Sequence, residues 1–232
     1  MSFQQGNLLL DQLPAEEVER VAPYLQLVSL EKDQWVCEQD SIIAHFHFPL
    51  TAVVLLSIEM SDGFHTDVAL ADCTGMFPLS AVADSHCLLG VRVFLPGLAY
   101  RIPVDVLRQE FSRGQAFSKL VMRAVRNMLA QLSMGTACFR RHSTRQILAK
   151  LLLMTLEHRR EEGLDITHAQ IADIVGVRRE AITLALKQLE HKGALECTRG
   201  KIRLLDRPTL EGLACNCFRS RTQLGSFQRL LV

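Results

Sequence analysis

The clearest alternation of apolar and polar positions lies between residues 166 and 206, in the stretch ITHAQIADIVGVRREAITLALKQLEHKGALECTRGKIRLLD. Apolar residues recur at helical spacing in two runs separated at Gly176, and a period of two follows from residue 194 to 205. Thr167 stands where an N-cap hydroxyl would satisfy the first free backbone N–H groups. The pattern predicts a helix, a tight turn, a second helix and a β-hairpin with its turn at Arg199-Gly200.

The predicted second helix has one apolar and one polar face. Ile182, Leu186 and Leu189 recur at helical spacing and would pack on the core. The residues that would then point outward are Arg178, Arg179, Glu180, Thr183 and Lys187. Two helices joined by a turn and followed by a basic hairpin make a winged helix-turn-helix. In that motif the second helix lies in the major groove of DNA with its N-terminal residues nearest the bases.

Each polar position of this segment has a predicted role in DNA binding. Arginine can bond bidentately to guanine and glutamate can accept from the N4 of cytosine, so the N-terminal end of the second helix is expected to read bases. Thr183 and Lys187 come later and are expected to reach phosphates, and the hairpin cations are expected to contact the DNA backbone. The predicted DNA-binding residues are Thr167, Arg178, Arg179, Glu180, Thr183, Lys187, Arg199, Lys201 and Arg203.

Charge is distributed unevenly along a chain that is nearly neutral, at a formal +1. Residues 1–137 hold 9 Lys and Arg against 15 Asp and Glu, a balance of −6, whereas residues 138–232 hold 17 against 10, a balance of +7. A basic C-terminal part suits a polyanion, and an acidic N-terminal part suits a different partner. The alternative, in which the basic residues are only the solvated face of an ordinary three-helix segment, stays open at this point.

The N-terminal part carries strand patterns. Predicted strands cover Trp35 to Cys37, Ile42 to Phe48, Val53 to Met60, Phe64 to Ala71 and Gly90 to Ile102. Asp62-Gly63 is a hairpin signal, Pro96-Gly97 interrupts the last strand, and Pro14 to Leu25 is predicted to be a helix. The expected fold class is therefore α+β, with a small antiparallel β-roll at the N-terminus.

Residues 115–141 predict one long helix between the two parts, and Ser143 is a natural N-cap for a further helix to about Glu162. One stripe follows a heptad spacing and is a candidate dimer seam: Met122, Val125, Leu129, Leu132, Thr136 and Phe139. A second stripe is expected to face the roll: Phe117, Val121, Ala124 and Met128. Both stripes packing within one monomer is the alternative. The dimer is favoured because two recognition helices about 34 Å apart match successive major grooves.

Taken together, the chain resembles the Crp/Fnr family of bacterial transcription regulators. The resemblance covers nearly the whole chain, and its most specific parts are ITHAQIADIVGVRREAIT and RGKIRLLDRPTLE, together with the order of β-rich sensor, long helix and winged helix. It implies a homodimer that binds a roughly palindromic site on double-stranded DNA, with RNA polymerase as a further partner. We expect a sensor domain at residues 1–114, a dimerisation helix and hinge at 115–142, a DNA-binding domain at 143–217 and a basic tail at 218–232.

The sensor region departs from the family's cyclic-nucleotide-binding members. Those members have a Gly-Glu-Leu turn and, about ten residues later, an Arg-Ser or Arg-Thr pair that binds the cyclic phosphate. This chain reads Gly75-Met76-Phe77-Pro78-Leu79, with Cys87-Leu88 in place of the pair, and it has no Glu or Arg between Met76 and Val91. A buried phosphate without a cationic partner is heavily penalised, which argues against the usual cyclic AMP geometry. The resemblance gives no effector in its place. Leu184 likewise stands where better-known members have a base-contacting arginine, so their operator sequence does not carry over.

The seven cysteines point to no disulfide framework, because their number is odd and the chain has no secretory leader pattern. The dense N-terminal cysteine cluster of the family's iron-sulfur members is missing, since Cys37 is the one cysteine before residue 70. Cys215 and Cys217 form a C-x-C pair that, with Cys138, is a candidate for redox sensing or for binding a soft metal. Two partly buried small side chains at a helix end are the alternative.

Other chemistry is weakly indicated. His45 and His47 alternate with Phe46 and Phe48, and we expect the histidines to face solvent opposite a buried Phe pair, because no third metal ligand is in sequence. The sequence has no G-x-S-x-G, G-x-x-x-x-G-K-[ST] or H-E-x-x-H motif, which disfavours an enzyme.

Two rival functions remain beside the expected regulator. One is a redox- or ligand-sensing module that acts through protein partners, and the other is a cyclic-nucleotide-dependent regulator. No apolar run approaches the roughly 18–20 residues that cross a membrane, so a cytoplasmic protein without membrane contact is expected.

Overall fold

The computed structural model describes residues 6–61, 63, 65–156, 163–198 and 200–217. The chain divides into two compact units, unit 1 (Met1–Leu129) and unit 2 (Ala130–Val232). Helix α3 (Ala116–Arg141) begins in unit 1 and ends in unit 2. Among the described helices, none combines the length and the apolar character that crossing a bilayer requires. The predicted basic tail and Arg199 lie outside the described residues.

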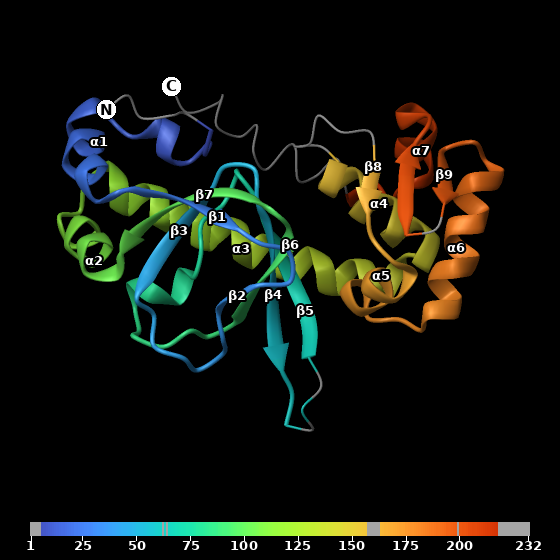
Figure 1. The fold of residues 1–232 in the computed structure, drawn as a ribbon, viewed down its shortest axis with the longest axis horizontal. Coiled ribbons are helices and arrows are strands. Elements are labelled where there is room, and N and C mark those ends of the chain that lie inside the picture. The colour runs from blue at the N-terminus through green and yellow to red at the C-terminus, as the bar shows by residue number, and fades with distance from the viewer. Residues whose placement is uncertain (1–5, 62, 64, 157–162, 199, 218–232) are drawn as a thin grey trace. The chain divides into compact units, whose positions relative to one another are not determined.

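Unit 1 is built on antiparallel sheets, as the sequence predicted (Figure 1). One sheet has the strand order β1-β7-β3 and the other the order β2-β6-β4-β5. The strands are β1 (Gln26–Leu30), β2 (Trp35–Cys37), β3 (His45–Pro49), β4 (Val53–Glu59), β5 (His65–Ala71), β6 (Gly90–Leu95) and β7 (Gly97–Pro103). The break between β6 and β7 falls where Pro96-Gly97 was expected. A side chain at Gly97 would lie 2.5 Å from the backbone nitrogen of Ala52, so only glycine fits there.

Several predicted boundaries shift in the structure. The strand expected from Ile42 begins only at His45, and Ile42 is exposed and forms an isolated bridge with His86. The predicted N-terminal helix is shorter, because α1 (Ala15–Val21) gives way to the 3-10 turn η2 (Ala22–Tyr24). Strand β1 and helix α2 (Val104–Ser112) were not predicted. The hairpin expected around Asp62-Gly63 is confirmed by the antiparallel pairing of β4 with β5, although Asp62 and Phe64 themselves lie outside the described residues. Two further 3-10 turns are η1 (Leu10–Gln12) and η3 (Leu79–Val82).

His47 corrects the expectation of a solvent-facing histidine pair. Its side chain is buried together with Phe46 and Phe48, and its ring stacks on Phe77 at 5.1 Å between centroids. Within the described structure its Nδ1 has no hydrogen-bond partner. Burial, followed by the charges of His45 and Arg101, lowers the pKa of His47 to about 3. The β3 strand is buried on both faces because β3 packs under the loop that carries Phe77, which the local alternation did not reveal.

A buried carboxylate joins the helices of unit 1. Glu17 of α1 accepts hydrogen bonds from the backbone nitrogens of Ala116 at 2.9 Å and Phe117 at 2.7 Å, so it caps the first turn of α3. Arg20 lies one turn further along α1 and bonds Glu110 of α2 at 3.1 Å. The two helices that flank the roll in sequence thereby hold the start of α3.

In the described part of unit 2, helices pack around α4 beside a small sheet. The elements after α3 are α4 (Thr144–Leu156), β8 (Gly163–Asp165), α5 (His168–Val175), α6 (Arg179–His191), β9 (Leu195–Thr198), β10 (Lys201–Leu204) and α7 (Arg207–Leu213). Helix α4 packs on α5, α6 and α7. The sheet has the strand order β8-β10-β9, so the predicted hairpin gains an edge strand that the sequence had not indicated. Ser143 caps α4 as predicted, since its hydroxyl accepts from the Gln146 nitrogen at 3.4 Å.

Replacing His47 with phenylalanine should reduce the acid sensitivity of the roll. The unfolded chain protonates this histidine near its ordinary pKa of 6.5, whereas the folded roll protonates it only near 3. The stability that neutral His47 contributes is therefore complete above 6.5 and is lost as the pH falls toward 3. As the pH falls from about 7.5 to about 5, the free energy of unfolding decreases by about 2 kcal/mol. Trp35 is the one tryptophan of the chain, and its fluorescence during denaturation measures the free energy of unfolding of unit 1.

The comparison uses the change in stability with pH for each protein, so a packing difference between the two side chains cancels. Equal losses in the wild type and His47→Phe over this pH interval would show that His47 does not titrate between the two states.

Candidate nucleic-acid interface

The turn of the helix-turn-helix is fixed by its own sequence. Thr167 accepts a hydrogen bond from the Gln170 backbone nitrogen at 3.2 Å, and Gln170 accepts one from the Thr167 nitrogen at 3.1 Å. This reciprocal capping box starts α5. Gly176 ends the helix in the left-handed region, at φ +70°, and its nitrogen bonds Ala172 O at 2.8 Å. The chain then turns directly into α6.

Helix α6 buries one face and exposes the other, as the spacing predicted. Ile182, Leu186 and Leu189 are at most 1% exposed, and the same face includes the buried Ala185. On the opposite side Arg178, Arg179, Glu180 and Lys187 are exposed. Arg178 is the N-cap residue, so the helix itself begins with Arg179. The four charged side chains thus lie on the solvent side of a helix that is firmly packed in unit 2.

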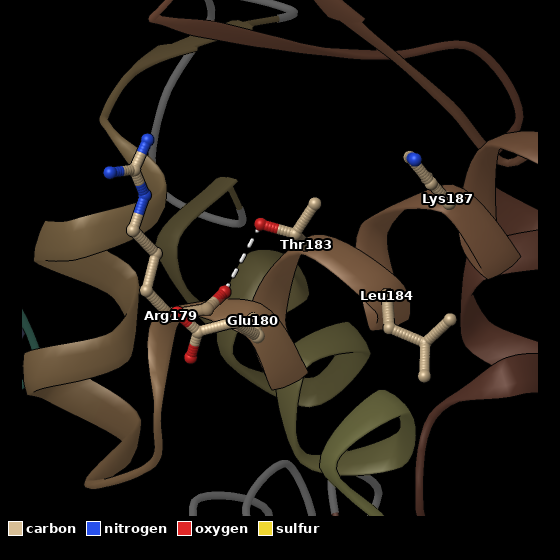
Figure 2. A pocket seen from close by; sticks show the side chains of 5 residues that line it. All are labelled: Arg179, Glu180, Thr183, Leu184 and Lys187. Atoms are coloured by element: carbon tan, nitrogen blue, oxygen red, sulfur yellow. Dashed lines mark hydrogen bonds between the residues drawn. The ribbon is translucent and has the colours of Figure 1, made fainter.

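The outward face of α6 lines an open hollow of about 410 Å³ (Figure 2). The side chains that line it are Arg179, Glu180, Thr183, Leu184 and Lys187. Arg179 and Glu180 lie at one end of the hollow and Lys187 at the other. Leu184 is 60% exposed between them, which is unusual for a leucine and places an apolar group on the surface that is otherwise polar.

Thr183 is less free than its neighbours. It is half-buried, and its hydroxyl donates to the Arg179 carbonyl at 3.1 Å. His168 Nδ1 lies 3.0 Å from the Thr183 hydroxyl oxygen. His168 is the first residue of α5, so this contact links the two helices of the motif. The sequence analysis did not single out His168. Its position directly after the N-cap Thr167 was the available signal, because the start of α5 lies close to α6.

The wing presents its cations on one face of a strand. Lys201 and Arg203 are exposed on β10, and Ile202 between them is buried. Arg203 pairs in register with Glu196 of β9. Lys201 forms an ion pair with Asp165 of β8 at 3.5 Å, with both side chains at least 70% exposed. Exposed pairs of this kind contribute about 0–1 kcal/mol, so Lys201 remains able to exchange its partner for a phosphate.

Comparison with known proteins gives the same assignment for this part of the chain. Residues 144–213 match the family model of the Crp-like helix-turn-helix domain. This segment contains α4, α5, α6, the wing and α7. Residues 144–213 of unit 2 are therefore similar to Crp-like helix-turn-helix domains. No curated protein matches the sequence.

Solved structures extend the likeness to the rest of the chain. FixK2 from Bradyrhizobium japonicum is 17% identical, with a TM-score of 0.70 over 82% of this chain and 98% of its own. A Crp/Fnr-family regulator from Eubacterium rectale is 18% identical, with a TM-score of 0.70 over 89% and 97%. A Crp/Fnr-family regulator from Thermus thermophilus is 20% identical, with a TM-score of 0.66 over 82% and 98%. Over 82–89% of its length the chain therefore shares the fold of these proteins, two of which are Crp/Fnr-family regulators.

The family match and the shared fold confirm the predicted resemblance and support a DNA-binding transcription regulator. The predicted α+β class, with an N-terminal roll, a long helix and a C-terminal Crp-like helix-turn-helix, is confirmed as well.

The predicted dimer stripe lies on the exposed side of α3. Met122 is 55% exposed, Leu129 65% and Phe139 53%. Val125 and Leu132 are half-buried, and Thr136 bonds the Leu132 carbonyl at 3.1 Å. In the second stripe Phe117, Val121 and Ala124 are buried in unit 1, and Met128 is half-buried.

The sensor region that lacks the nucleotide-binding residues is filled by apolar side chains. Met76, Phe77, Ala81 and Cys87 are each at most 1% exposed. Arg108 of α2 donates to the carbonyls of Ala81 at 3.0 Å and Asp84 at 2.6 Å, so its guanidinium is occupied by the backbone there. His86 is exposed beside Asp84.

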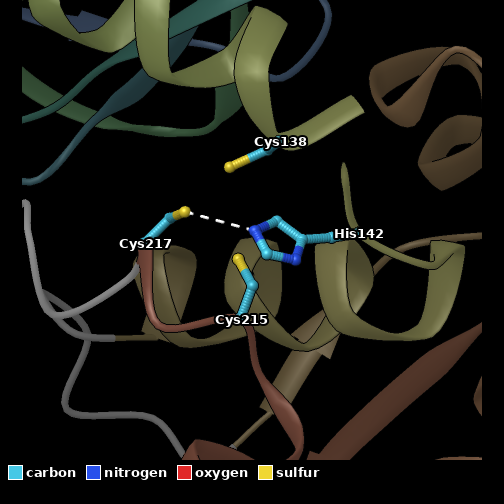
Figure 3. A group of neighbouring side chains, drawn as sticks. All are labelled: Cys138, His142, Cys215 and Cys217. Carbon is cyan, nitrogen blue, oxygen red and sulfur yellow. Dashed lines mark hydrogen bonds between the residues drawn. The ribbon is translucent and has the colours of Figure 1, made fainter. Parts of the chain in front are cut away.

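The three candidate thiols of unit 2 come together, and a histidine joins them (Figure 3). The ligand atoms of Cys138, His142, Cys215 and Cys217 all lie within 4.8 Å of one another. Burial, followed by Cys138, raises the pKa of the Cys215 thiol, and the same two causes raise that of Cys217 to about 11. His142, directly after the end of α3, was missed as a partner, although its position four residues after Cys138 was the signal.

Thr167→Ala should destabilise α5 by about 1 kcal/mol, because it removes an N-cap acceptor while leaving the exposed surface nearly unchanged. Hydrogen exchange of the α5 amides measures this as about a fivefold faster opening. Thr167→Ser is the matched control, because it keeps the hydroxyl and should exchange at nearly the wild-type rate. Equal exchange in the alanine and wild-type proteins would mean that the capping box does not support α5 in solution.

Proposed function

We propose that this protein is a dimeric transcription regulator that inserts α6 into the major groove of a roughly palindromic operator. The observation that carries the proposal is the outward face of α6, where Arg179, Glu180 and Lys187 surround a hollow on a helix whose other face is buried. A recognition helix needs both properties. Its side chains must reach base edges, and the helix must be held firmly enough to fix the register on DNA.

The charged residues of α6 would divide the contacts by position along the helix. Arg179 and Glu180 stand at the N-terminal end, which lies nearest the bases, and they suit guanine and cytosine respectively. Lys187 stands two turns later and would contact phosphate. Leu184 lies between them and offers an apolar surface to a thymine methyl group, where better-known relatives offer an arginine. Thr183 is tied to His168 and would position α6 rather than read a base.

The wing would add contacts that do not depend on sequence. Lys201 and Arg203 lie on the exposed face of β10, and Arg199 belongs to the same hairpin in sequence. Backbone contacts by such cations release counterions, so affinity for DNA should fall steeply with the logarithm of the salt concentration. A module that acted only through protein partners would lack this dependence. Salt dependence therefore separates the regulator from that rival function.

Dimerisation through α3 would supply the second half-site contact. Met122, Leu129 and Phe139 are large apolar side chains that are more than half exposed on one helix, and such a stripe favours pairing with a second copy. RNA polymerase is the further partner that the family resemblance implies, and a regulator of this kind acts in the cytoplasm. The protein would carry out no chemical reaction of its own.

The N-terminal roll would act as a sensor through a ligand other than cyclic AMP in its usual geometry. Met76, Phe77 and Cys87 fill the region in which a cyclic phosphate would need a cation, and Arg108 is held by two carbonyls. The effector would change the spacing of the two recognition helices by shifting the population of dimer geometries.

Arg179→Ala should relax sequence preference, whereas Lys201→Ala should weaken binding to all sequences about equally. Selection of bound sequences from random duplex DNA, with the purified protein as isolated and again with reductant, first gives the wild-type motif. Arg179→Ala should then cost about 1–3 kcal/mol on the best site and much less on a site changed at the contacted base pair. Lys201→Ala should reduce the steepness of log affinity against log salt by about one unit, the value of one phosphate contact.

An Arg179→Ala protein that keeps the full preference of the wild type would show that α6 does not read bases as placed. A two-fold symmetric motif supports the dimer, and failure to enrich any motif under every condition would count against sequence-specific binding.

Leu129→Asp should convert the dimer to monomer, because each copy would bring a charge into the proposed apolar seam. Light scattering after size exclusion measures the mass, and affinity for a full palindromic site should fall by at least about tenfold. Lys119→Glu, on the same helix but outside the stripe, is the control for a change of charge and should leave the mass unchanged. A wild type of monomer mass, or a Leu129→Asp protein that stays dimeric, would place the seam elsewhere.

A further inference from the structure

Four metal-binding side chains of unit 2 meet at one point, although they come from segments more than 70 residues apart in sequence. Cys138 and His142 stand at the end of α3, where the His142 nitrogen bonds the Cys138 carbonyl at 2.9 Å. That bond keeps the helical geometry through His142 and places both side chains on the same side. Cys215 and Cys217 follow the end of α7. Figure 3 shows the four side chains pointing toward a common centre.

The spacing of the ligand atoms fits a single ion. In a tetrahedral site with metal–sulfur distances of about 2.3 Å, the ligand atoms are about 3.8 Å apart. Here all of them lie within 4.8 Å of one another, and Cys217 Sγ lies 3.4 Å from His142 Nε2. The largest of these separations exceeds the tetrahedral value by about 1 Å, so binding would require only small movements of the ligand atoms.

The surroundings suit a site that carries negative charge. Three thiolates and a divalent ion together carry a charge of −1, and the ammonium group of Lys150 lies 3.4 Å from Cys138 Sγ. Lys150 would balance that charge and orient the Cys138 sulfur, as outer-shell partners do in metal sites. Cys138 and Cys215 are buried, and Cys217 and His142 are half-buried.

We propose that Cys138, His142, Cys215 and Cys217 bind one zinc ion that fastens the end of α3 to the segment following α7. Three sulfurs and one imidazole nitrogen form a complete tetrahedral set of the kind found in structural zinc sites, with no position left for water or substrate. On binding, the three thiols release their protons to solvent and histidine binds as the neutral ring, so no oxidant or reductant is involved.

The role of this ion would be structural and local. Residues 138–142 lie where α3 ends, directly before α4, and residues 215–217 follow α7 at the end of the described part of unit 2. A zinc ion would join these two ends with bonds that do not loosen when the short helix α7 frays. Two alternatives use the same atoms, namely a disulfide between a pair of these thiols and an iron-containing centre. The test distinguishes both from zinc.

Metal analysis of the full chain without a histidine tag is the first measurement. Mass spectrometry of the elements should find about one zinc per chain and negligible iron. A thiol reagent should label Cys138, Cys215 and Cys217 much more slowly in the zinc-bound protein than after a chelator has removed the ion. Cobalt added to the reduced, zinc-free chain should give the intense absorption of a tetrahedral site with thiolate ligands.

Variants then assign the site. Cys215→Ser and His142→Ala should weaken zinc binding by more than about 100-fold, measured by competition with a chelator. Cys197→Ser is the matched control, since it is the same substitution in the same unit at a thiol outside the group, and it should retain one zinc. If either ligand variant fails to fold, Lys150→Met keeps all four ligands and should still weaken zinc binding by about tenfold.

The proposal is overturned by a reduced wild-type chain that takes up neither zinc nor cobalt. It is also overturned by iron in place of zinc, by a disulfide among these residues in freshly isolated protein, or by Cys215→Ser holding zinc as tightly as Cys197→Ser. None of these readouts uses DNA, so their outcome is independent of whether the proposed regulatory function holds.

Discussion

The start of α3 depends on the Glu17 carboxylate, which is 100 residues away from the Phe117 nitrogen that it binds. The first turn of a helix has free N–H groups, and in a buried position they need a partner. Glu17 supplies it, and the Arg20–Glu110 pair fixes α1 against α2. Once its first turn is fixed, the rotation of α3 about its own axis is fixed as well. Val121 then faces the core of unit 1, and Met122 faces outward.

This constraint explains why one helix can carry two apolar stripes without contradiction. The buried stripe packs within unit 1, whereas Met122 and Leu129 of the other stripe stay more than half exposed in the described structure. A helix held only by apolar contacts could rotate about its axis and bury either one stripe or the other. The buried carboxylate prevents that, because rotation would break two hydrogen bonds to a charged group, each worth about 1.5–3 kcal/mol.

Elements with local signals could be predicted from the sequence, and elements that depend on distant partners could not. Thr167, Gln170 and Gly176 fix the boundaries of α5 within ten residues, and the apolar spacing of α6 does the rest. Strand β8 has three residues and exists because β10 pairs with it. His47 alternates with phenylalanines like a surface residue, and only the loop carrying Phe77 makes it a core residue.

The same division holds for the candidate sites. The charged face of α6 could be predicted because helix geometry converts spacing directly into direction. The C-x-C pair and Cys138 could be named as candidates, but the fourth side chain depended on where α3 ends. His142 stands after the last residue of α3, and whether it continues the helical direction is decided by the bond from its nitrogen to Cys138. A change of one residue in that boundary would turn the imidazole away from the thiols.

Two adjacent residues near the end of α3 therefore have different surroundings. Cys138 is 1% exposed and faces the proposed metal site, whereas Phe139 is 53% exposed and belongs to the proposed dimer seam. Successive residues on a helix differ by about 100° in direction, so a rotation of the last turn that moves one must move the other. Metal binding or its loss at Cys138 would thus act directly on the proposed dimer contact through a rigid turn of helix. Coupling between the two proposed sites requires that this turn have two arrangements and that each site favour one of them.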